Sequence, residues 1–326
     1  MIILAGAGTT GRVIARDLAA KGEEFVFADN DESKWGSVME GVPVFSPAHA
    51  KESFPDATWI ASVVRPERHE IIAQIAAMGV KSVPMWDFVP KRYNLPPKNV
   101  CDFIYPLLYD KKSIRFWDDQ ILFRSDPEHH VQIPQSNIDH IYFEDFITPR
   151  EDEHYVDCGA ADGDTIRDFL KWSPKYKMIS AFEPDDANFE KLCAAAPGTD
   201  RYHAAVSDYT GYGAFTATGD YSSSLNRDGK GTVVVKSLDT ALFEPPTFIK
   251  MDIEGSELEA LWGARRILKE YKPVLAVCAY HEAEHLWEIP LLIHALQPEY
   301  EFFLRRYAES TFETVWYAVP AERVRR

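Results

Sequence analysis

The chain has 326 residues, 46% of them hydrophobic and 13% aromatic, which is enough for two ordinary domains and excludes wholesale disorder. Asp and Glu number 51 against 35 Lys and Arg, so the formal net charge is −16. A surface this acidic repels phosphate backbones and anionic lipid, and we therefore expect neither nucleic acid nor membranes as partners.

The N-terminal stretch MIILAGAGTTG has no basic segment and is broken by glycines, so we expect no signal peptide. No stretch approaches the ~18 apolar residues that span a bilayer. The four cysteines (Cys101, Cys158, Cys193 and Cys278) include no CxxC pair. This scatter predicts a cytoplasmic protein without a disulfide framework or a zinc site.

Residues 1–92 alternate expected strands and helices, which predicts a small Rossmann-like domain with a parallel sheet. GAGTTG supplies Gly6, Gly8 and Gly11 between the first strand and the first helix, and Asp29 ends the next strand. This is the pattern of a dinucleotide site, and an acid at Asp29 suits NAD. The domain is short and offers no clear hydride-transfer residues. A nucleotide or nucleotide-sugar ligand, a purely structural fold and a dehydrogenase all stay open.

Residues 93–141 break this alternation. They combine proline-containing loops with many aromatic residues and are too apolar for a flexible linker. We expect an ordered connection that covers one domain or helps to form a homodimer.

From Tyr155 the alternation resumes, and we expect a second domain over residues 142–326. The last two expected strands, EFFLRRY and TVWYAV, are too close in sequence for a crossover helix, so they must form an antiparallel hairpin. The pattern predicts a doubly wound α/β sheet with an antiparallel final strand. The Ser- and Gly-rich loop 219–231 is equally consistent with a mobile lid and with a plain solvated loop.

A glycine-rich turn follows the first strand of this second domain. VDCGAADGDT places Asp157, Gly159, Ala161 and Gly163 between a strand and a helix, and Glu183 closes the next strand. Glycines let the backbone approach a ligand, and an acid at that strand end can bind ribose hydroxyls. The pattern fits an adenosine-containing cofactor.

Several stretches in this order resemble the FkbM family of methyltransferases: VDCGAADGDT, AFEPDDANFEKL, AAVSDYTG, VKSLDT, FIKMDIEGSELEALWGA, KPVLAVCAYH and ETVWYAV. The resemblance implies a class I methyltransferase fold, S-adenosylmethionine as donor, and usually O-methylation of a sugar or natural-product hydroxyl. Ala161 departs from the glycine that class I enzymes often have there. The run over residues 27–47 is similar to the Rossmann-like N-terminal domain of sugar O-acyltransferases.

The same motifs imply a cofactor site. Asp157 and Gly159 should lie by the methionine part of the cofactor and Glu183 on its ribose. Ser207 and Asp208 stand where adenine contacts usually lie, although Asp208 is as readily explained as a turn residue.

Charged residues end the fourth and fifth strands of this domain. Lys250, Asp252 and Glu254 alternate, so we expect them on one side of the fourth strand, facing His281 at the end of the fifth. An alkyl hydroxyl needs a base, and we favour His281, with Asp252 or Glu254 orienting it or taking its place.

Other interpretations of this cluster stay open. In one alternative, Lys250 and Glu254 form an ion pair that only shapes the pocket. In another, Asp252, Glu254 and His281 hold a divalent cation. Our preferred assignment contains no metal. The run His-Glu-Ala-Glu-His from His281 matches the HExxH motif, but that zinc site needs both histidines on one helix, and His281 follows a strand-like run. Ser256 with Glu259 has the spacing of a helix capping box.

The sequence thus predicts an O-methyltransferase of polysaccharide or natural-product biosynthesis. The expected acceptor is a sugar, a polysaccharide precursor or a related natural product, and one form of this hypothesis has the acceptor linked to a nucleotide. The alternatives are an NAD-dependent oxidoreductase using the N-terminal glycines, and a non-catalytic scaffold that retains cofactor binding.

Overall fold

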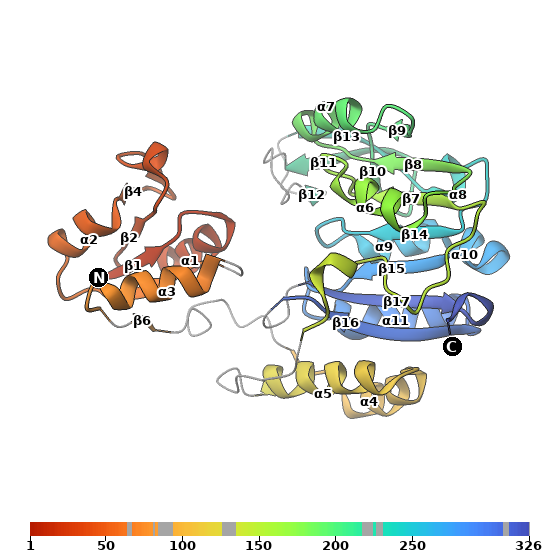
Figure 1. Ribbon diagram of the computed structural model, residues 1–326, viewed down its shortest axis with the longest axis horizontal. Coiled ribbons are helices and arrows are strands. Elements are labelled where there is room, and N and C mark those ends of the chain that lie inside the picture. The colour runs from red at the N-terminus through yellow and green to blue at the C-terminus, as the bar shows by residue number, and fades with distance from the viewer. Residues whose placement is uncertain are drawn as a thin grey trace. The chain divides into compact units, whose positions relative to one another are not determined.

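The computed structural model describes residues 1–63, 67–80, 82–83, 94–125, 135–216, 224–225, 231–308 and 313–325. The chain divides into two compact units, one of Met1–Tyr93 with Leu122–His130 and the other of Asn94–Ile121 with Val131–Arg326. Figure 1 draws the first unit mainly in red and orange and the second mainly in yellow, green and blue. Among the described residues, no helix is both long enough and apolar enough to cross a membrane.

The N-terminal unit is built on a six-stranded sheet in the order β3-β4-β2-β1-β5-β6, parallel except for the β3–β4 pair. Its strands are β1 (Ile2–Ala5), β2 (Phe25–Ala28), β3 (Val38–Met39), β4 (Val42–Phe45), β5 (Thr58–Ala61) and β6 (Ser82–Val83). Its helices are α1 (Thr9–Ala20), η1 (Glu32–Lys34), α2 (Pro47–Ser53) and α3 (Glu67–Ala77). Every residue of β1 and β2 is buried, as expected for parallel strands covered on both faces. The predicted Rossmann-like sheet is confirmed, with the short antiparallel β3 as an addition.

The C-terminal unit contains a seven-stranded sheet in the order β16-β17-β15-β14-β7-β8-β9. Its strands are β7 (His154–Cys158), β8 (Met178–Phe182), β9 (Asp200–Tyr202), β14 (Phe248–Met251), β15 (Val274–Cys278), β16 (Tyr300–Arg306) and β17 (Thr314–Pro320). β17 runs antiparallel to both β15 and β16, whereas the remaining pairs are parallel. The predicted doubly wound sheet with an antiparallel closing hairpin is therefore confirmed.

The helices of this unit cover both faces of the sheet (Figure 1). They are α6 (Asp164–Trp172), α7 (Asp186–Ala195), α8 (Leu238–Ala241), α9 (Glu257–Gly263), α10 (Arg265–Tyr271), α11 (His285–Leu296), η4 (Ile138–His140) and η5 (Ala321–Arg323). Alternate strand residues enter two separate apolar clusters: Val156 and Cys158 pack with α9 to α11, whereas Tyr155 packs with α6 and α7. Both faces are buried, so polar side chains gather at the ends of the strands.

A small second sheet has the order β10-β13-β11-β12. Its strands are β10 (Ala205–Val206), β11 (Gly211–Thr216), β12 (Ser224–Leu225) and β13 (Gly231–Lys236). Most of the loop 219–231 lies outside the described residues. The two alternatives for this loop, a mobile lid and a plain solvated loop, therefore stay predictions.

The segment after residue 93 covers the outer edge of the large sheet. It forms α4 (Lys98–Ile104), η3 (Tyr105–Leu107) and α5 (Lys111–Ser125). Tyr109 N donates to Phe302 O at 2.8 Å, and Leu304 N donates to Ser113 Oγ at 3.0 Å, so backbone groups of the edge strand β16 are satisfied. An edge strand without such cover is a template for aggregation. Residues 94–121 thus pack as part of the C-terminal unit.

Candidate active site

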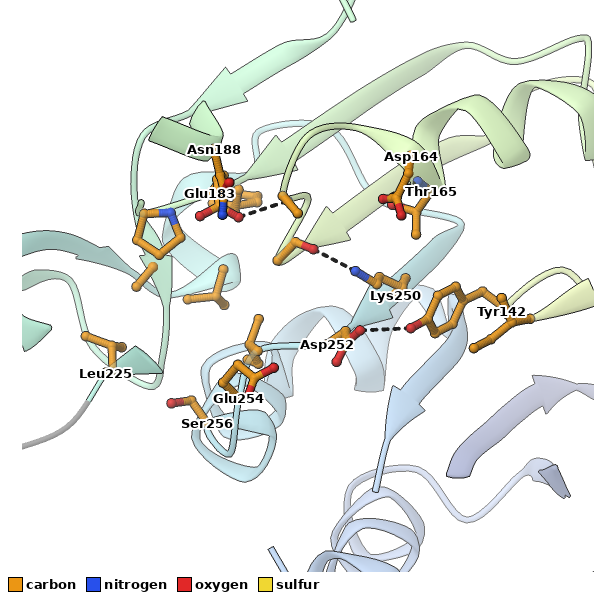
Figure 2. A pocket seen from close by; sticks show the side chains of 18 of the residues that line it. Tyr142, Asp164, Thr165, Glu183, Asn188, Leu225, Lys250, Asp252, Glu254 and Ser256 are labelled. Carbon is orange, nitrogen blue, oxygen red and sulfur yellow. Dashed lines mark hydrogen bonds between the residues drawn. The ribbon is translucent and has the colours of Figure 1, made fainter. Parts of the chain in front are cut away.

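The carboxyl ends of the central parallel strands surround a cavity of about 330 Å³. Ligands of doubly wound sheets bind at this edge because the loops after adjacent strands diverge there. Figure 2 shows Glu183 on one side of the space, and Asp252 and Glu254 on the other. Further lining residues are Ile141, Tyr142, Gly159, Ala161, Asp164, Thr165, Asn188, Ala205, Val206, Phe215, Leu225, Lys250, Ser256, Tyr280 and Glu313.

The turn after β7 requires its first glycine. Gly159 has φ +80°, and a Cβ there would lie 2.0 Å from the carbonyl oxygen of Asp252. The loops that follow β7 and β14 can approach this closely only because position 159 has no side chain. Ala161 has φ +43°, a conformation that costs a non-glycine residue more, which accounts for the glycine that class I enzymes often have there.

Glu183 reaches from the end of β8 to this turn. Its Oε2 accepts a hydrogen bond from Ala161 N at 2.9 Å, and its Oε1 accepts one from Asp185 N at 2.8 Å. Burial raises its pKa, although the two amides oppose that shift. Each carboxylate oxygen keeps a second lone pair, so Glu183 can still accept two hydroxyl groups from a ligand in the cavity.

Asp157 and Lys250 form a buried ion pair beside the turn. The parallel register of β14 with β7 sets Lys250 next to Asp157, with Nζ 3.1 Å from Oδ1. Lys250 Nζ also donates to Gly159 O at 2.7 Å, and Thr165 Oγ1 donates to Asp157 Oδ2. Burial opposes the ammonium charge, but the carboxylates of Asp157 and Asp252 raise the pKa of Lys250. The pair fixes the glycine turn.

Two sequence-based expectations need correction here. Lys250 pairs with Asp157 and not with Glu254, so the alternative interpretation of a Lys250–Glu254 ion pair is wrong. Strand β14 ends at Met251, and Glu254 has φ +54° in the turn that follows, so strand alternation is not the reason that the three charged residues face one space. The cavity does bring together Lys250, Asp252 and Glu254. Asp157 itself does not line it.

His281 lies behind the cavity wall. Its Nδ1 is 2.8 Å from Glu257 Oε1, and its Nε2 is 3.3 Å from Asp252 Oδ1 and 3.4 Å from Glu254 Oε1. Burial opposes a charge on the imidazole, yet these carboxylates raise the pKa of His281 well above its usual range. A protonated imidazole cannot accept a proton. The structure therefore does not favour His281 as the base.

The structure also settles two motif assignments. His281 lies in a bend and α11 begins only at His285, so the two histidines of the HExxH match do not share a helix. Ser256 is the N-cap residue of α9, but its side chain makes no capping hydrogen bond. The capping-box prediction is wrong in that respect, and Ser256 lines the cavity instead.

Three wall residues escaped the sequence analysis. Tyr142 OH donates to Asp252 Oδ2 at 2.9 Å, and Tyr280 OH donates to Asp252 Oδ1 at 3.2 Å. Glu313, which precedes β17, lines the same wall, and burial together with Asp252 raises its pKa to about 7. Tyr142 lies 110 residues before its partner. No local pattern could have linked Tyr142 to Asp252.

Residues 157–308 match the family model of the methyltransferase FkbM domain. The chain carries an FkbM methyltransferase domain. It is also similar to the crystal structure of methyltransferase FkbM from Methylobacillus flagellatus KT, with 22% identity and a TM-score of 0.71, over 97% of this chain and 89% of that one. This second likeness concerns the fold.

Other solved structures resemble the chain only weakly. UDP-D-quinovosamine 4-dehydrogenase from Vibrio fischeri has 20% identity and a TM-score of 0.22, over 31% of this chain and 82% of that one. Precorrin-6y C5,15-methyltransferase from Geobacter metallireducens GS-15 has 11% identity and a TM-score of 0.35, over 57% and 94%. Neither likeness bears on function. No curated protein matches the chain.

The FkbM domain makes this protein an S-adenosylmethionine-dependent methyltransferase. The cavity residues fit an adenosyl group, because the Glu183 carboxylate faces a wall that is largely apolar around Phe182, Val206 and Phe215. Ribose hydroxyls would meet the carboxylate, and a flat base would lie on the apolar side chains. Leu225 also lines the cavity (Figure 2).

Ser207 and Asp208 do not line this cavity. Ser207 is buried, and its carbonyl oxygen packs against Gly263, where a Cβ would lie 2.1 Å away. Gly163, with φ +84°, caps α6 and also stands back from the cavity. Adenine contacts by Ser207 and Asp208 stay a prediction, and the preceding residues Ala205 and Val206 are better placed for them.

Glu183 gives the first testable prediction. We expect Glu183→Ala to weaken the binding of S-adenosylhomocysteine by about tenfold to a hundredfold, because hydrogen bonds to a charged group contribute roughly 1.5–3 kcal/mol each. Isothermal titration measures this. Glu190→Ala removes an exposed glutamate of α7 and should leave the affinity unchanged. An unchanged affinity in Glu183→Ala would place the ribose elsewhere.

Glu313 gives a pH-dependent prediction. Its pKa is raised from 4.5 to about 7, so its contribution to stability is present below pH 4.5 and is lost as the pH rises through about 7. Relative to Glu313→Gln, the wild type should lose about 3 kcal/mol of unfolding free energy between about pH 4.5 and about pH 8. Urea unfolding in a chelating buffer measures the difference. A difference that does not change with pH would show that Glu313 titrates normally.

The N-terminal unit has a cavity of about 350 Å³ around its own glycine turn. A Cβ at Gly11 would lie 2.0 Å from Gly6 O, so these two glycines serve close packing of α1 on β1. Gly8, in contrast, has nothing within 4 Å of an added Cβ. Asp29 Oδ2 accepts from Ala7 N at 2.7 Å and also faces Lys34 Nζ at 3.2 Å. Gly6, Gly8 and Asp29 line this cavity, and Gly11 does not.

Proposed function

We propose that the protein transfers the methyl group of S-adenosylmethionine to a hydroxyl of a sugar, a polysaccharide precursor or a related natural product. One observation carries this proposal: a single cavity joins the glycine turn and Glu183 to a wall that contains Asp252, Glu254 and Glu313. A donor site and groups able to accept a proton thus share one space.

The wall supplies what hydroxyl methylation needs. The donor provides a methyl group on a sulfonium, which is already activated, so the protein has to orient the acceptor and remove its proton. The new O–C bond forms as the C–S bond breaks, and the electron pair of that bond stays on sulfur. We assign the hydroxyl proton to Glu313, because a base whose pKa is about 7 is well matched to neutral pH.

Polar wall residues also suit a saccharide acceptor. Tyr142, Tyr280 and Ser256 offer hydroxyl groups beside the carboxylates, and such groups hydrogen-bond to sugar hydroxyls. The N-terminal cavity, with Gly8 open and Asp29 at its edge, supports a nucleotide-linked acceptor as the ligand of that unit. The two units serve one reaction in this proposal.

Methyl transfer tests the proposal directly. The full chain is incubated with S-adenosylmethionine labelled in its methyl group and with a panel of saccharides and nucleotide-sugars. We expect label in an alkali-stable methyl ether of at least one acceptor. Label on an amine would contradict O-methylation, and tight S-adenosylhomocysteine binding without transfer to any acceptor would favour the non-catalytic scaffold.

A further inference from the structure

One buried nitrogen beside the cavity makes two ion-pair contacts but no hydrogen bond to any residue that the structure describes. It is Nε2 of His281, whose side chain is only 7% exposed. This nitrogen points at Asp252 Oδ1, 3.3 Å away, and at Glu254 Oε1, 3.4 Å away. Both contacts are longer than a good hydrogen bond to nitrogen, so the space between Nε2 and the two carboxylates can take a ligand that all three groups share.

A neighbouring carboxylate holds the ring of His281 in the way that metal-binding histidines are held. Its Nδ1 is held at 2.8 Å by Glu257, which is fully buried, and the other oxygen of Glu257 lies 3.1 Å from His285 Nδ1. Histidines that bind metals usually have their second ring nitrogen fixed by a carboxylate in this way. Tyr142 and Tyr280 hold Asp252 in the same manner.

The charges favour a cation with more than one positive charge. Three carboxylates, of Asp252, Glu254 and Glu257, lie within 3.4 Å of the imidazole of His281. One proton on the imidazole neutralises at most one of them. Asp252 and Glu254 also line the cavity, so a cation between them would keep coordination positions open to a substrate.

We propose that Asp252, Glu254 and His281 bind one divalent transition-metal ion such as Mn²⁺, and that the ion displaces the proton of His281 Nε2 to solvent as it binds. The ligand atoms lie within 4.8 Å of one another. Ligands at right angles around an ion at about 2.1 Å lie about 3 Å apart, so small side-chain shifts complete the site. The imidazole favours a transition metal over Mg²⁺ or Ca²⁺.

The ion has a clear task in hydroxyl methylation, and this part of the inference rests on the proposed function. The ion binds the acceptor hydroxyl and lowers its pKa, and Glu313 on the same wall takes the released proton. The preferred sequence-based assignment contained no metal. The contact of Glu257 with Nδ1, which leaves Nε2 of His281 to face Asp252 and Glu254, is the observation that the sequence could not supply.

Manganese titration of the full chain tests the site without an assay of activity. The protein is stripped with a chelator and titrated with MnCl₂, with free Mn²⁺ followed by electron paramagnetic resonance. We expect one ion per chain, and at least tenfold weaker binding in Asp252→Asn and in Glu254→Gln. Glu254 is 30% exposed, so Glu254→Gln should fold even if other variants do not. Glu288→Gln, an exposed position on α11, is the matched control.

The outcomes separate the metal site from the proposed function. Absence of Mn²⁺ binding, or equal binding in wild type, Asp252→Asn and Glu254→Gln, would overturn the site. Methylation of the acceptor at the full rate by the stripped enzyme would also contradict the metal site. The proposed methyl transfer would then be retained without a metal ion. Manganese binding that is lost in both variants would establish the site even if no hydroxyl acceptor is found.

Discussion

Replacing Lys250 with methionine is expected to lower the free energy of unfolding by about 3–5 kcal/mol. The substitution removes the only cation within ion-pair distance of Asp157 among the described residues, and Asp157 is fully buried. A carboxylate left unpaired in the interior carries its whole desolvation cost. The hydrogen bond to Gly159 O is also lost, so the glycine turn loosens. Urea unfolding followed by circular dichroism measures the change.

Two further variants make this prediction specific. Lys269→Met removes an exposed lysine of α10 and should change the unfolding free energy by less than about 0.5 kcal/mol. Adding Asp157→Asn to Lys250→Met removes the unpaired charge and should restore part of the loss. If Lys250→Met were as stable as Lys269→Met, the buried pair would not be what holds the turn.

Replacing Glu313 with glutamine is expected to lower kcat for methyl transfer by about 10²–10³-fold. Glutamine keeps the shape of the side chain but cannot take the hydroxyl proton. Glu313 makes no contact that we assign to the donor, so the affinity for S-adenosylhomocysteine should stay unchanged. Single-turnover transfer to an acceptor from the saccharide panel, with titration of S-adenosylhomocysteine, measures both.

The pH profile distinguishes a base from a merely structural residue. The wild-type rate should rise with pH as the carboxyl of Glu313 loses its proton, and Glu313→Gln should lose that rise. Glu288→Gln, at an exposed position, should retain the wild-type profile. A Glu313→Gln enzyme that is slow but keeps the rise would assign the proton transfer to another group, and Asp252 would be the next candidate on the wall.

The architecture could be read from the sequence because it depends on local patterns. The strand ends carrying Asp157, Glu183 and Lys250 follow from apolar runs that stop at a charged residue or a glycine. The closing hairpin follows from the short gap between β16 and β17. These features involve residues close together in the chain, where hydrophobic periodicity is informative.

The chemistry of the site depended on contacts that no local pattern contains. Strand register, and not spacing, sets Lys250 beside Asp157. His281 has a raised pKa because Glu257, on another element, lies against its Nδ1. Tyr142 comes from the connection before β7, and Glu313 from the turn before β17. The sequence indicated the edge of the sheet at which the cavity lies, but it could not assign roles to the residues there.

Titration of the full chain with S-adenosylhomocysteine and, separately, with NAD tests the central claim most directly. We predict that S-adenosylhomocysteine binds at one site per chain in the micromolar range, and that Glu183→Ala weakens this binding at least tenfold. Absence of S-adenosylhomocysteine binding, together with NAD binding that depends on Asp29, would contradict the account and would move the chemistry to the N-terminal cavity.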